Sequence, residues 1–375
     1  MRIAFVYDRV NKFGGAERVL LALHEIWPEA PLYTAVYNPK SAGWARKFKV
    51  IPSFLNKFPF AKGRHEAYPY LMPLAFESFS FNGYDVIVSI TSEAAKGIIT
   101  KPKALHLCYC LTPTRYLWSG YEDYFSSSVF RFFSSPLVAY LRRWDKIAAQ
   151  RPDLYLATCE NVKKRIKKYY GRDSKVIYPP VDIKKFKRKH LRGEVRPIQK
   201  RTPRRWSEDD YFLVVSRLVG YKKVDLAIEA FNQLGLPLKI IGSGRQMGRL
   251  RRMAKDNIEF LGELTGKRLL GYYQRCQAVI FPQEEDFGLV PLEAQACGKP
   301  VIAYRKGGAL ETVIEGKTGL FFSPQTAEAL ARLVKKFNLA QFDPLVCRRN
   351  ANRFSKERFA REIKKFIEET WTKKK

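Results

Sequence analysis

The feature that most constrains this chain is an alternation of short apolar strands and helical segments that runs through the first half and restarts in the second. In the first half we predict strands at residues 3–7, 32–36, 86–89, 104–109 and 154–157. In the second half we predict them at residues 211–215, 238–241, 258–261, 278–281 and 301–303. Strands that alternate with helices form parallel sheets covered on both faces. The pattern therefore predicts an α/β chain with two Rossmann-like domains whose parallel sheets face a central cleft.

The 375 residues are enough for these two domains and for their connections. We place an N-terminal domain at residues 1–183, a linker at 184–206, a C-terminal domain at 207–354 and a last helix at 355–375. The linker is rich in Lys and Arg without apolar periodicity, so it reads as a solvated connection or as a patch that attracts phosphate or lipid. The last helix carries the apolar stripe Phe359, Ile363, Phe366 and Ile367, which either caps the C-terminal domain or packs back on the N-terminal one.

The formal net charge of +32 limits the classes of partner. Nucleic acid, an anionic membrane and anionic small substrates could each account for it. No run of about 18 apolar residues predicts a transmembrane helix. Residues 1–8 read as a buried strand that charge interrupts too early for a signal peptide. The six cysteines lack zinc-binding spacing and most stand in apolar surroundings, so we expect reduced, buried thiols in a cytoplasmic protein.

The most informative short segment is residues 285–298. A predicted strand leads into Glu285, Pro291 can open a helix, and Gly298 is suited to close that helix in the left-handed conformation. The start of a helix offers free N–H groups and partial positive charge to an anion such as a diphosphate. The carboxylates of Glu285 and Glu293 are strong acceptors for the hydroxyls of a sugar or a ribose. The segment therefore outlines a site for a nucleotide sugar.

Two cations follow the first strand of the second half and complete this outline. Arg217 and Lys222 stand in a loop after that strand, where a cation pair can hold two phosphates and neutralise charge on a leaving diphosphate. The alternative is a solvated surface pair. No Asp-x-Asp motif is positioned to hold a metal, so we expect no metal and no cofactor besides the nucleotide sugar itself. Gly14 and Gly15, between a strand and a helix, either form an ordinary turn or let the backbone approach the phosphates.

An ordered set of motifs resembles the retaining glycosyltransferases of the GT-B fold that form the fourth family in the usual classification, also called group 1. In the second half it comprises Val215-Ser216-Arg217-Leu218 with Lys222, Ile241-Gly242-Ser243-Gly244, Phe260-Leu261-Gly262, Glu285-x7-Glu293, Pro300-Val301-Ile302, Gly307-Gly308 and Glu315-Gly316-x-Thr318-Gly319. In the first half, residues 13–18 and 108–116 look like the mannosyltransferase-like branch, and residues 176–182 look like the passage before its domain crossover. The resemblance covers nearly the whole chain.

This resemblance implies a role for each candidate donor-binding residue. It places Glu285 on the transferred sugar and Glu293 on the ribose, with Arg217 and Lys222 on the phosphates. It also assigns donor contacts to Phe287 and to the backbone of Gly288, Leu289 and Val290, and phosphate contacts to Gly14 and Gly15. The catalytic set is Glu285, Arg217 and Lys222. The resemblance leans towards GDP-mannose as donor.

The chain departs from the family pattern where many relatives carry a histidine, because Leu111 stands there and can neither accept a proton nor form a hydrogen bond. His106 and Arg115 are the remaining acceptor-side candidates, and His106 also reads as a strand-face residue. A retaining reaction needs no protein base if the leaving phosphate takes the proton of the acceptor. We expect that route, because no carboxylate of the first half is an obvious nucleophile.

Two first-half segments, residues 54–65 and 118–143, mix aromatic side chains with Lys and Arg. Such segments suit either core packing or an anionic membrane interface, and the second fits a peripheral enzyme at the inner face of a membrane with a lipid-linked acceptor. We expect a hexosyltransferase that uses a nucleotide sugar and a glycan or lipid-linked acceptor, with no specific nucleic-acid partner. A GT-B nucleotide-sugar epimerase, an inactive relative and a basic nucleic-acid-binding protein are the alternatives.

Overall fold

The computed structural model describes residues 1–124, 128–186 and 210–374. It divides into two compact units, one of Met1–Pro180 with Glu357–Lys375 and one of Val181–Lys356. From residue 187 onward, the predicted linker lies outside the described residues. Its first part holds Phe186, which is buried in the second unit with its ring centroid 5.9 Å from that of Tyr273.

The first unit is built on a seven-stranded sheet in the order β3-β2-β1-β4-β5-β6-β7. All its strand pairs are parallel. The strands are β1 (Ile3–Tyr7), β2 (Leu32–Thr34), β3 (Val50–Pro52), β4 (Val86–Thr91), β5 (Leu105–Cys110), β6 (Leu154–Ala157) and β7 (Ser174–Val176). Strands β3 and β7 were not predicted, because each is a three-residue strand at one edge of the sheet, too short to give a clear strand pattern. The predicted parallel architecture is confirmed.

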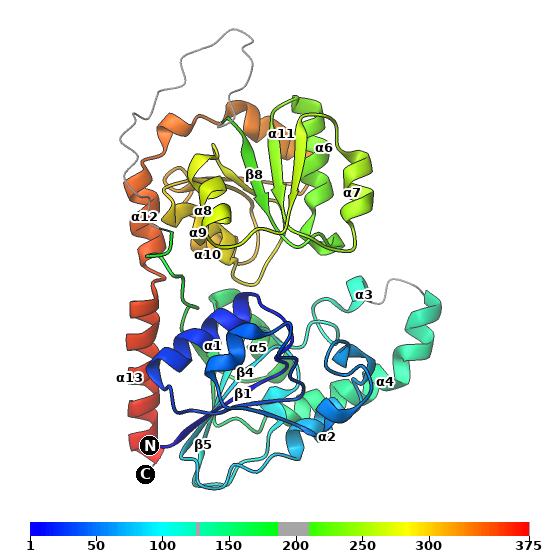
Figure 1. Cartoon of the computed structure of the whole chain (residues 1–375), viewed down its shortest axis with the longest axis vertical. Helices are drawn as coiled ribbons and strands as arrows, with labels where there is room; N and C mark the ends of the chain where they lie inside the picture. Colours follow the sequence, from blue (N-terminus) through cyan, green and yellow to red (C-terminus); the bar gives the residue numbers. More distant parts are fainter. Residues whose placement is uncertain (125–127, 187–209, 375) are drawn as a thin grey trace. The chain divides into compact units, whose positions relative to one another are not determined.

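Helices cover both faces of this sheet (Figure 1). The helices of this unit, not all of which lie on the sheet, are α1 (Gly15–Ile26), α2 (Met72–Glu77), α3 (Tyr121–Tyr124), α4 (Ser128–Ala148), α5 (Glu160–Tyr170) and α13 (Lys356–Lys374). On one face, α1 and α13 pack on β1, where Leu20 and Ile363 share a core with Phe5. On the other, Phe76 of α2 packs with Val6. The apolar stripe of the last helix therefore belongs to the core of the first unit.

The second unit holds a six-stranded sheet in the order β10-β9-β8-β11-β12-β13. Its strands are all parallel and comprise β8 (Phe212–Val215), β9 (Leu238–Ile241), β10 (Ile258–Gly262), β11 (Val279–Phe281), β12 (Val301–Tyr304) and β13 (Gly319–Phe322). Strand β8 separates its side chains onto two faces, with Phe212 and Val214 in one core and Leu213 in the other. Both faces are buried, as a parallel sheet requires.

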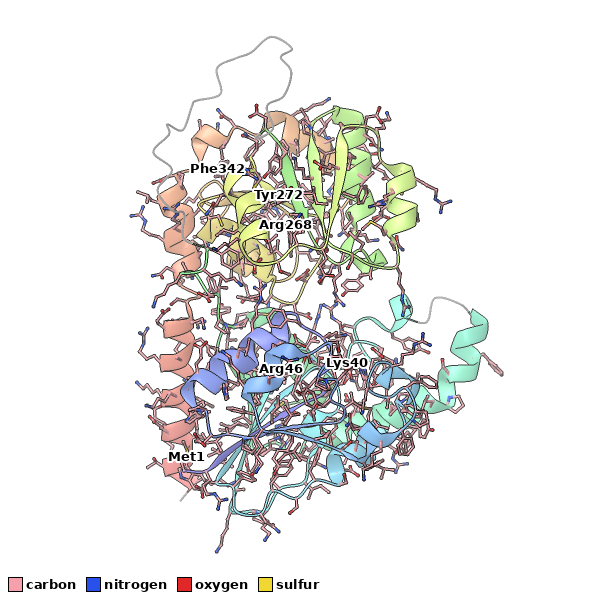
Figure 2. The ribbon with its side chains drawn as sticks, viewed as in Figure 1. Met1, Lys40, Arg46, Arg268, Tyr272 and Phe342 are labelled. Atoms are coloured by element: carbon pink, nitrogen blue, oxygen red, sulfur yellow. The ribbon has the colours of Figure 1, made fainter. Side chains whose placement is uncertain are left out.

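The helices of the second unit are α6 (Val224–Leu234), α7 (Met247–Met253), α8 (Gly266–Arg275), α9 (Leu289–Ala296), α10 (Ala309–Thr312), α11 (Ala327–Lys336) and α12 (Pro344–Asn352). Helices α6, α7 and α11 share one core, and α8, α9, α10 and α12 share the other. Figure 2 shows Arg268 and Tyr272 on α8, and the carbonyl of Tyr272 accepts a hydrogen bond from the Tyr211 hydroxyl at 2.9 Å. This bond ties α8 to the residue before β8.

Candidate functional site

The strand order of the second unit places two loops at its switch point. The chain runs from β8 outward to β9 and β10, then returns to the other side of β8 with β11. Ligands of open parallel sheets bind where the strand order reverses, beyond the carboxyl ends of the strands. Here the ends of β8 and β11 lead into residues 216–223 and 282–288, which contain most of the second-half candidates. The other three, Leu289, Val290 and Glu293, lie in α9.

Lys222 and Glu285 come from these two loops, and their side chains form an ion pair. The Lys222 side chain is 11% exposed and that of Glu285 is 21% exposed, so the pair is largely shielded from solvent. Gln283 donates a hydrogen bond from Nε2 to the same carboxylate oxygen, Oε1 of Glu285, at 2.9 Å. The ammonium of Lys222 and the amide of Gln283 therefore both contact one carboxylate oxygen of Glu285 at the switch point.

Glycine lets the loop after β12 approach the backbone of Glu285. Gly307 has φ +67°, and a Cβ there would stand 2.4 Å from the Glu285 carbonyl oxygen. The neighbouring Gly308 donates its N–H to that same carbonyl at 2.8 Å. Any larger side chain at Gly307 would displace the segment that carries the Glu285 carboxylate. The Gly307-Gly308 motif thus has a local structural reason.

The helix start predicted after this loop is confirmed. Helix α9 begins at Leu289, with Gly288 as its N-cap at φ 84°, and it ends before Gly298, which has φ +78° as predicted. Val290 lies in its first turn. Phe287 is buried, and its ring centroid lies 5.6 Å from that of Phe354, so its side chain anchors the loop. The N–H groups of the first turn have no partner within the helix and can meet an anion.

Glu293 lies inside α9 and is only 2% exposed. Its Oε2 accepts a hydrogen bond from the hydroxyl of Tyr273 on α8 at 2.7 Å. A buried carboxylate needs such a donor, because an unpaired charge in the interior is strongly unfavourable. The sequence predicted Glu293 as a ribose contact but not Tyr273, which stands in the apolar stripe of α8 and reads as a core aromatic.

Arg217 lies in the loop after β8, where its guanidinium donates to the Tyr221 hydroxyl. The ring of Tyr221 also lies beside both cations, with its centroid 5.9 Å from Cζ of Arg217 and 5.2 Å from Nζ of Lys222. Tyr221 thus links the two candidate phosphate ligands by cation–π contacts. Sequence reasoning missed it, although its position between two expected ligands was a usable signal.

The Gly14-Gly15 candidate lies at the start of α1 in the first unit. Gly14 is the N-cap of that helix without a side-chain cap, and both glycines are exposed. Below them, the hydroxyl of Tyr7 donates to Glu17 at 2.7 Å. Burial and the Glu17 carboxylate raise the pKa of Tyr7 well above its ordinary value. The glycine backbone is accessible, as phosphate binding requires.

The acceptor-side candidates occupy different surroundings in this unit. His106 is fully buried in β5 and lies 2.9 Å from the Ser89 hydroxyl through its Nε2. Burial lowers the pKa of His106 to about 3, so the ring is neutral at physiological pH. Arg115 is half-buried in the loop after β5, and Leu111 is partly buried against the core of β1. Only Arg115 has a side chain that reaches solvent as a charged group.

The first aromatic and basic segment, residues 54–65, is largely on the surface. Phe60 is 83% exposed and holds φ 56°, a conformation that a bulky residue rarely adopts. Phe54, Phe58, Lys57 and Lys62 are exposed as well. Of the second segment, residues 125–127 lie outside the structure described here. Trp118, at the start of this second segment, has its ring stacked on that of Tyr169 at a centroid distance of 5.3 Å.

No group of three or more His, Cys, Asp or Glu side chains within residues 1–124, 128–186 and 210–374 is arranged to hold a metal ion. Within the same ranges, no helix combines the length and the apolar character that crossing a bilayer requires. All six cysteines are buried, as predicted.

Comparison with known proteins identifies related sequences. Residues 195–354 match the family model described as "Glycosyl transferases group 1". The alpha-1,3/1,6-mannosyltransferase ALG2 of Dictyostelium discoideum is 26% identical over 306 residues, which cover 71% of this chain and 69% of that protein. A GDP-mannose-dependent monoacylated alpha-(1-6)-phosphatidylinositol monomannoside mannosyltransferase of Corynebacterium glutamicum is 38% identical over 135 residues. That match covers 32% of this chain and 35% of the relative. Several curated relatives are matched over only about a third of their own length.

Solved structures share the fold of the whole chain. The structure of Anabaena Alr3699/HepE in complex with UDP superposes with a TM-score of 0.71 at 18% identity. The superposition covers 98% of this chain and 100% of the HepE chain. At this identity the likeness establishes the architecture, which is the two-unit GT-B fold.

Proposed function

We propose that this chain, whose residues 195–354 match the group 1 glycosyl transferases, transfers a hexose, with mannose favoured, from a nucleotide diphosphate sugar with retention of the anomeric configuration. The observation that carries this proposal is the convergence of Lys222 and Glu285 at the switch point, beside the start of α9. GDP-mannose is the favoured donor, because two relatives are named as GDP-mannose-dependent mannosyltransferases.

Each candidate residue has a distinct task in the proposed reaction. The helix start at Leu289, Arg217 and Lys222 bind the two phosphates and stabilise the charge that grows on the leaving diphosphate. The Glu285 carboxylate faces the positive charge that develops near the anomeric carbon. Lys222 touches Glu285 directly, so one ammonium group serves both the phosphates and the orientation of the carboxylate.

The proposed reaction needs no side chain of the protein to act as a base. The bond between the anomeric carbon and the phosphate oxygen breaks, and the acceptor oxygen forms its bond on the same face of the sugar. The proton of the acceptor hydroxyl passes to the leaving phosphate oxygen. Leu111 has no group that could accept this proton, which supports the route. The cations of the loop after β8 supply the positive charge, so we propose that the reaction is independent of metal.

For the acceptor we propose a glycan or a lipid-linked sugar that reaches the first unit at an anionic membrane surface. The exposed aromatics of residues 54–65 can enter a headgroup layer while Lys57, Lys62 and Arg64 meet anionic lipid. The relative from Corynebacterium glutamicum is named for its action on a phosphatidylinositol monomannoside. Cosedimentation with vesicles tests this part: binding should need anionic lipid and should weaken in Phe60→Ser, and equal binding to neutral vesicles would contradict it.

The direct test of the proposed reaction measures nucleotide release from GDP-mannose and UDP-glucose, with and without membrane extracts as acceptor. Wild-type chain should release GDP from GDP-mannose, and Glu285→Ala should be severely impaired. Near wild-type turnover in both Glu285→Ala and Lys222→Ala would remove the site assignment.

A further inference from the structure

Gln283 is a buried side chain at the carboxyl end of β11 to which neither the motifs nor the comparisons assign a role. Only 1% of its surface is exposed. Its Nε2 donates to Oε1 of Glu285 at 2.9 Å, and the ammonium of Lys222 contacts that same oxygen. The Glu285 carboxylate is therefore held from two sides, by a flexible cation and by a rigid neutral amide.

The backbone that carries Gln283 is itself fixed. The carbonyl of Pro282 accepts a hydrogen bond at 2.7 Å from Nε2 of Gln325, which precedes α11. Pro282 directly follows β11, whose residues pair with both β8 and β12. An amide on such a support can hold a carboxylate in one rotation, which a lysine on a four-carbon stem does less well.

We propose that Gln283 is a positioning residue that orients the Glu285 carboxylate towards the transferred sugar. This inference rests on the proposed function, since it concerns the reaction of the same site. The group must be neutral and must donate, because Lys222 already supplies the positive charge and a second carboxylate would repel Glu285. An amide meets both conditions at every pH at which the enzyme is folded.

The chain contains a matched control at the other end of the same strand. Gln277 precedes β11 at its amino end and donates from Nε2 to Oδ1 of Asp210 at 3.1 Å. Each glutamine therefore bonds to a carboxylate through its amide, and the Oε1 of each is buried without a hydrogen-bond partner among the residues described. Only Gln283 lies at the carboxyl end, where ligands bind. Replacing either residue by Met keeps the volume and removes the donor.

The test compares Gln283→Met, Gln283→Glu and Gln277→Met in steady-state release of nucleotide, using whichever of GDP-mannose and UDP-glucose the wild-type chain turns over. Gln283→Met should lower kcat by about 10- to 100-fold, since a misplaced reacting group costs that order. The donor KM and the thermal shift with the free nucleoside diphosphate should stay within about twofold, because neither reports the orientation of Glu285. Gln277→Met should match wild type in all three.

The pH profile of Gln283→Glu separates positioning from mere support of the loop. A protonated carboxylic acid can donate an O–H to Glu285 and replace the amide, whereas an ionised one repels it. The activity of Gln283→Glu should therefore rise towards wild type as the pH falls, while that of Gln283→Met should stay low throughout. If Gln283→Met fails to fold, this profile decides alone.

Two outcomes would overturn the inference. One is a wild-type kcat in Gln283→Met, and the other is an activity of Gln283→Glu that does not recover at low pH. Lys222→Met distinguishes this failure from that of the proposed function. If Lys222→Met is inactive while Gln283→Met is normal, only the role of Gln283 is wrong. If neither change matters and no nucleotide binds, the proposed function itself is wrong.

Discussion

Replacement of Lys222 by Met should separate the stability of the second unit from its activity. Methionine keeps the apolar stem but removes the ammonium, which leaves the Glu285 carboxylate without its cation. Exposed ion pairs contribute roughly 0–1 kcal/mol, and breaking a fully buried pair costs about 3–5 kcal/mol. With exposures of 11% and 21%, this pair lies between these limits, so we expect a loss of about 1–3 kcal/mol in the free energy of unfolding.

The effect on the reaction should be larger than the effect on the fold. Loss of one preorganised donor to developing charge lowers the rate by about 10²–10³, or roughly 3–4 kcal/mol of activation free energy. Urea denaturation measures the first quantity, and nucleotide release from the donor sugar measures the second. Adding Glu285→Gln to Lys222→Met removes the unpaired charge, so stability should return towards wild type while activity stays low.

Lys239→Met is the matched control for this experiment. Its ammonium lies 3.2 Å from the Glu259 carboxylate, in the same sheet but away from the two loops of the switch point. These side chains are 22% and 57% exposed, so the change should alter stability by less than about 1 kcal/mol and leave turnover intact. Wild-type turnover in Lys222→Met, or a double variant no more stable than Lys222→Met alone, would contradict these expectations.

Three further predictions concern the backbone and the first unit. Gly307→Ala should reduce both stability and nucleotide release, because its Cβ would meet the Glu285 carbonyl. Gly316→Ala is the control: it has the same left-handed strain but no neighbouring atoms, so it should retain nucleotide release in the same assay. Lys96→Met should destabilise the chain by about 3–5 kcal/mol in urea denaturation, because it leaves the Asp145 carboxylate buried without the ammonium that lies 2.5 Å away; a loss below about 1 kcal/mol would contradict this. Burial lowers the pKa of His106 to about 3, so the unfolded chain takes up a proton that the folded chain refuses, and stability should fall as pH drops from 6.5 towards 3. His106→Gln should flatten this slope in denaturation curves recorded across that pH range, and an unchanged slope would contradict the argument.

The strands of both sheets were predictable because a parallel sheet buried on both faces needs continuous apolar runs. Residues 3–7 and 238–241 were predicted with the bounds that the structure has. The three strands that were missed, β3, β7 and β13, are short, and each lies at the edge of its sheet. Strand β3 has only two residues before Pro52, and β7 contains Lys175, so neither shows the longer apolar run of a central strand. Strand β13 begins at Gly319, in a motif that reads as a turn.

Some residues of the candidate site were predictable from the sequence and others were not. Lys222 and Glu285 were both selected from the sequence, because each follows a predicted strand and stands in a motif that resembles the family. Their contact across 63 residues of sequence depends on the strand order, which periodicity does not give. Gln283 and Tyr273 were missed because a single buried donor leaves no periodic trace. Such residues are found only when their partner atoms are known.

Every step of the proposed reaction requires that the second unit bind a nucleotide sugar through its diphosphate. Thermal unfolding with GDP, UDP, GDP-mannose and UDP-glucose tests it most directly, because a ligand that binds only the folded chain must stabilise it, by about 2.7 kcal/mol at a hundredfold excess over Kd. We expect a rise in Tm with at least one nucleoside diphosphate, with GDP favoured. The rise should be lost in a variant that combines Arg217→Ala with Lys222→Met. No rise with any of the four ligands, or an equal rise in that variant, would contradict it.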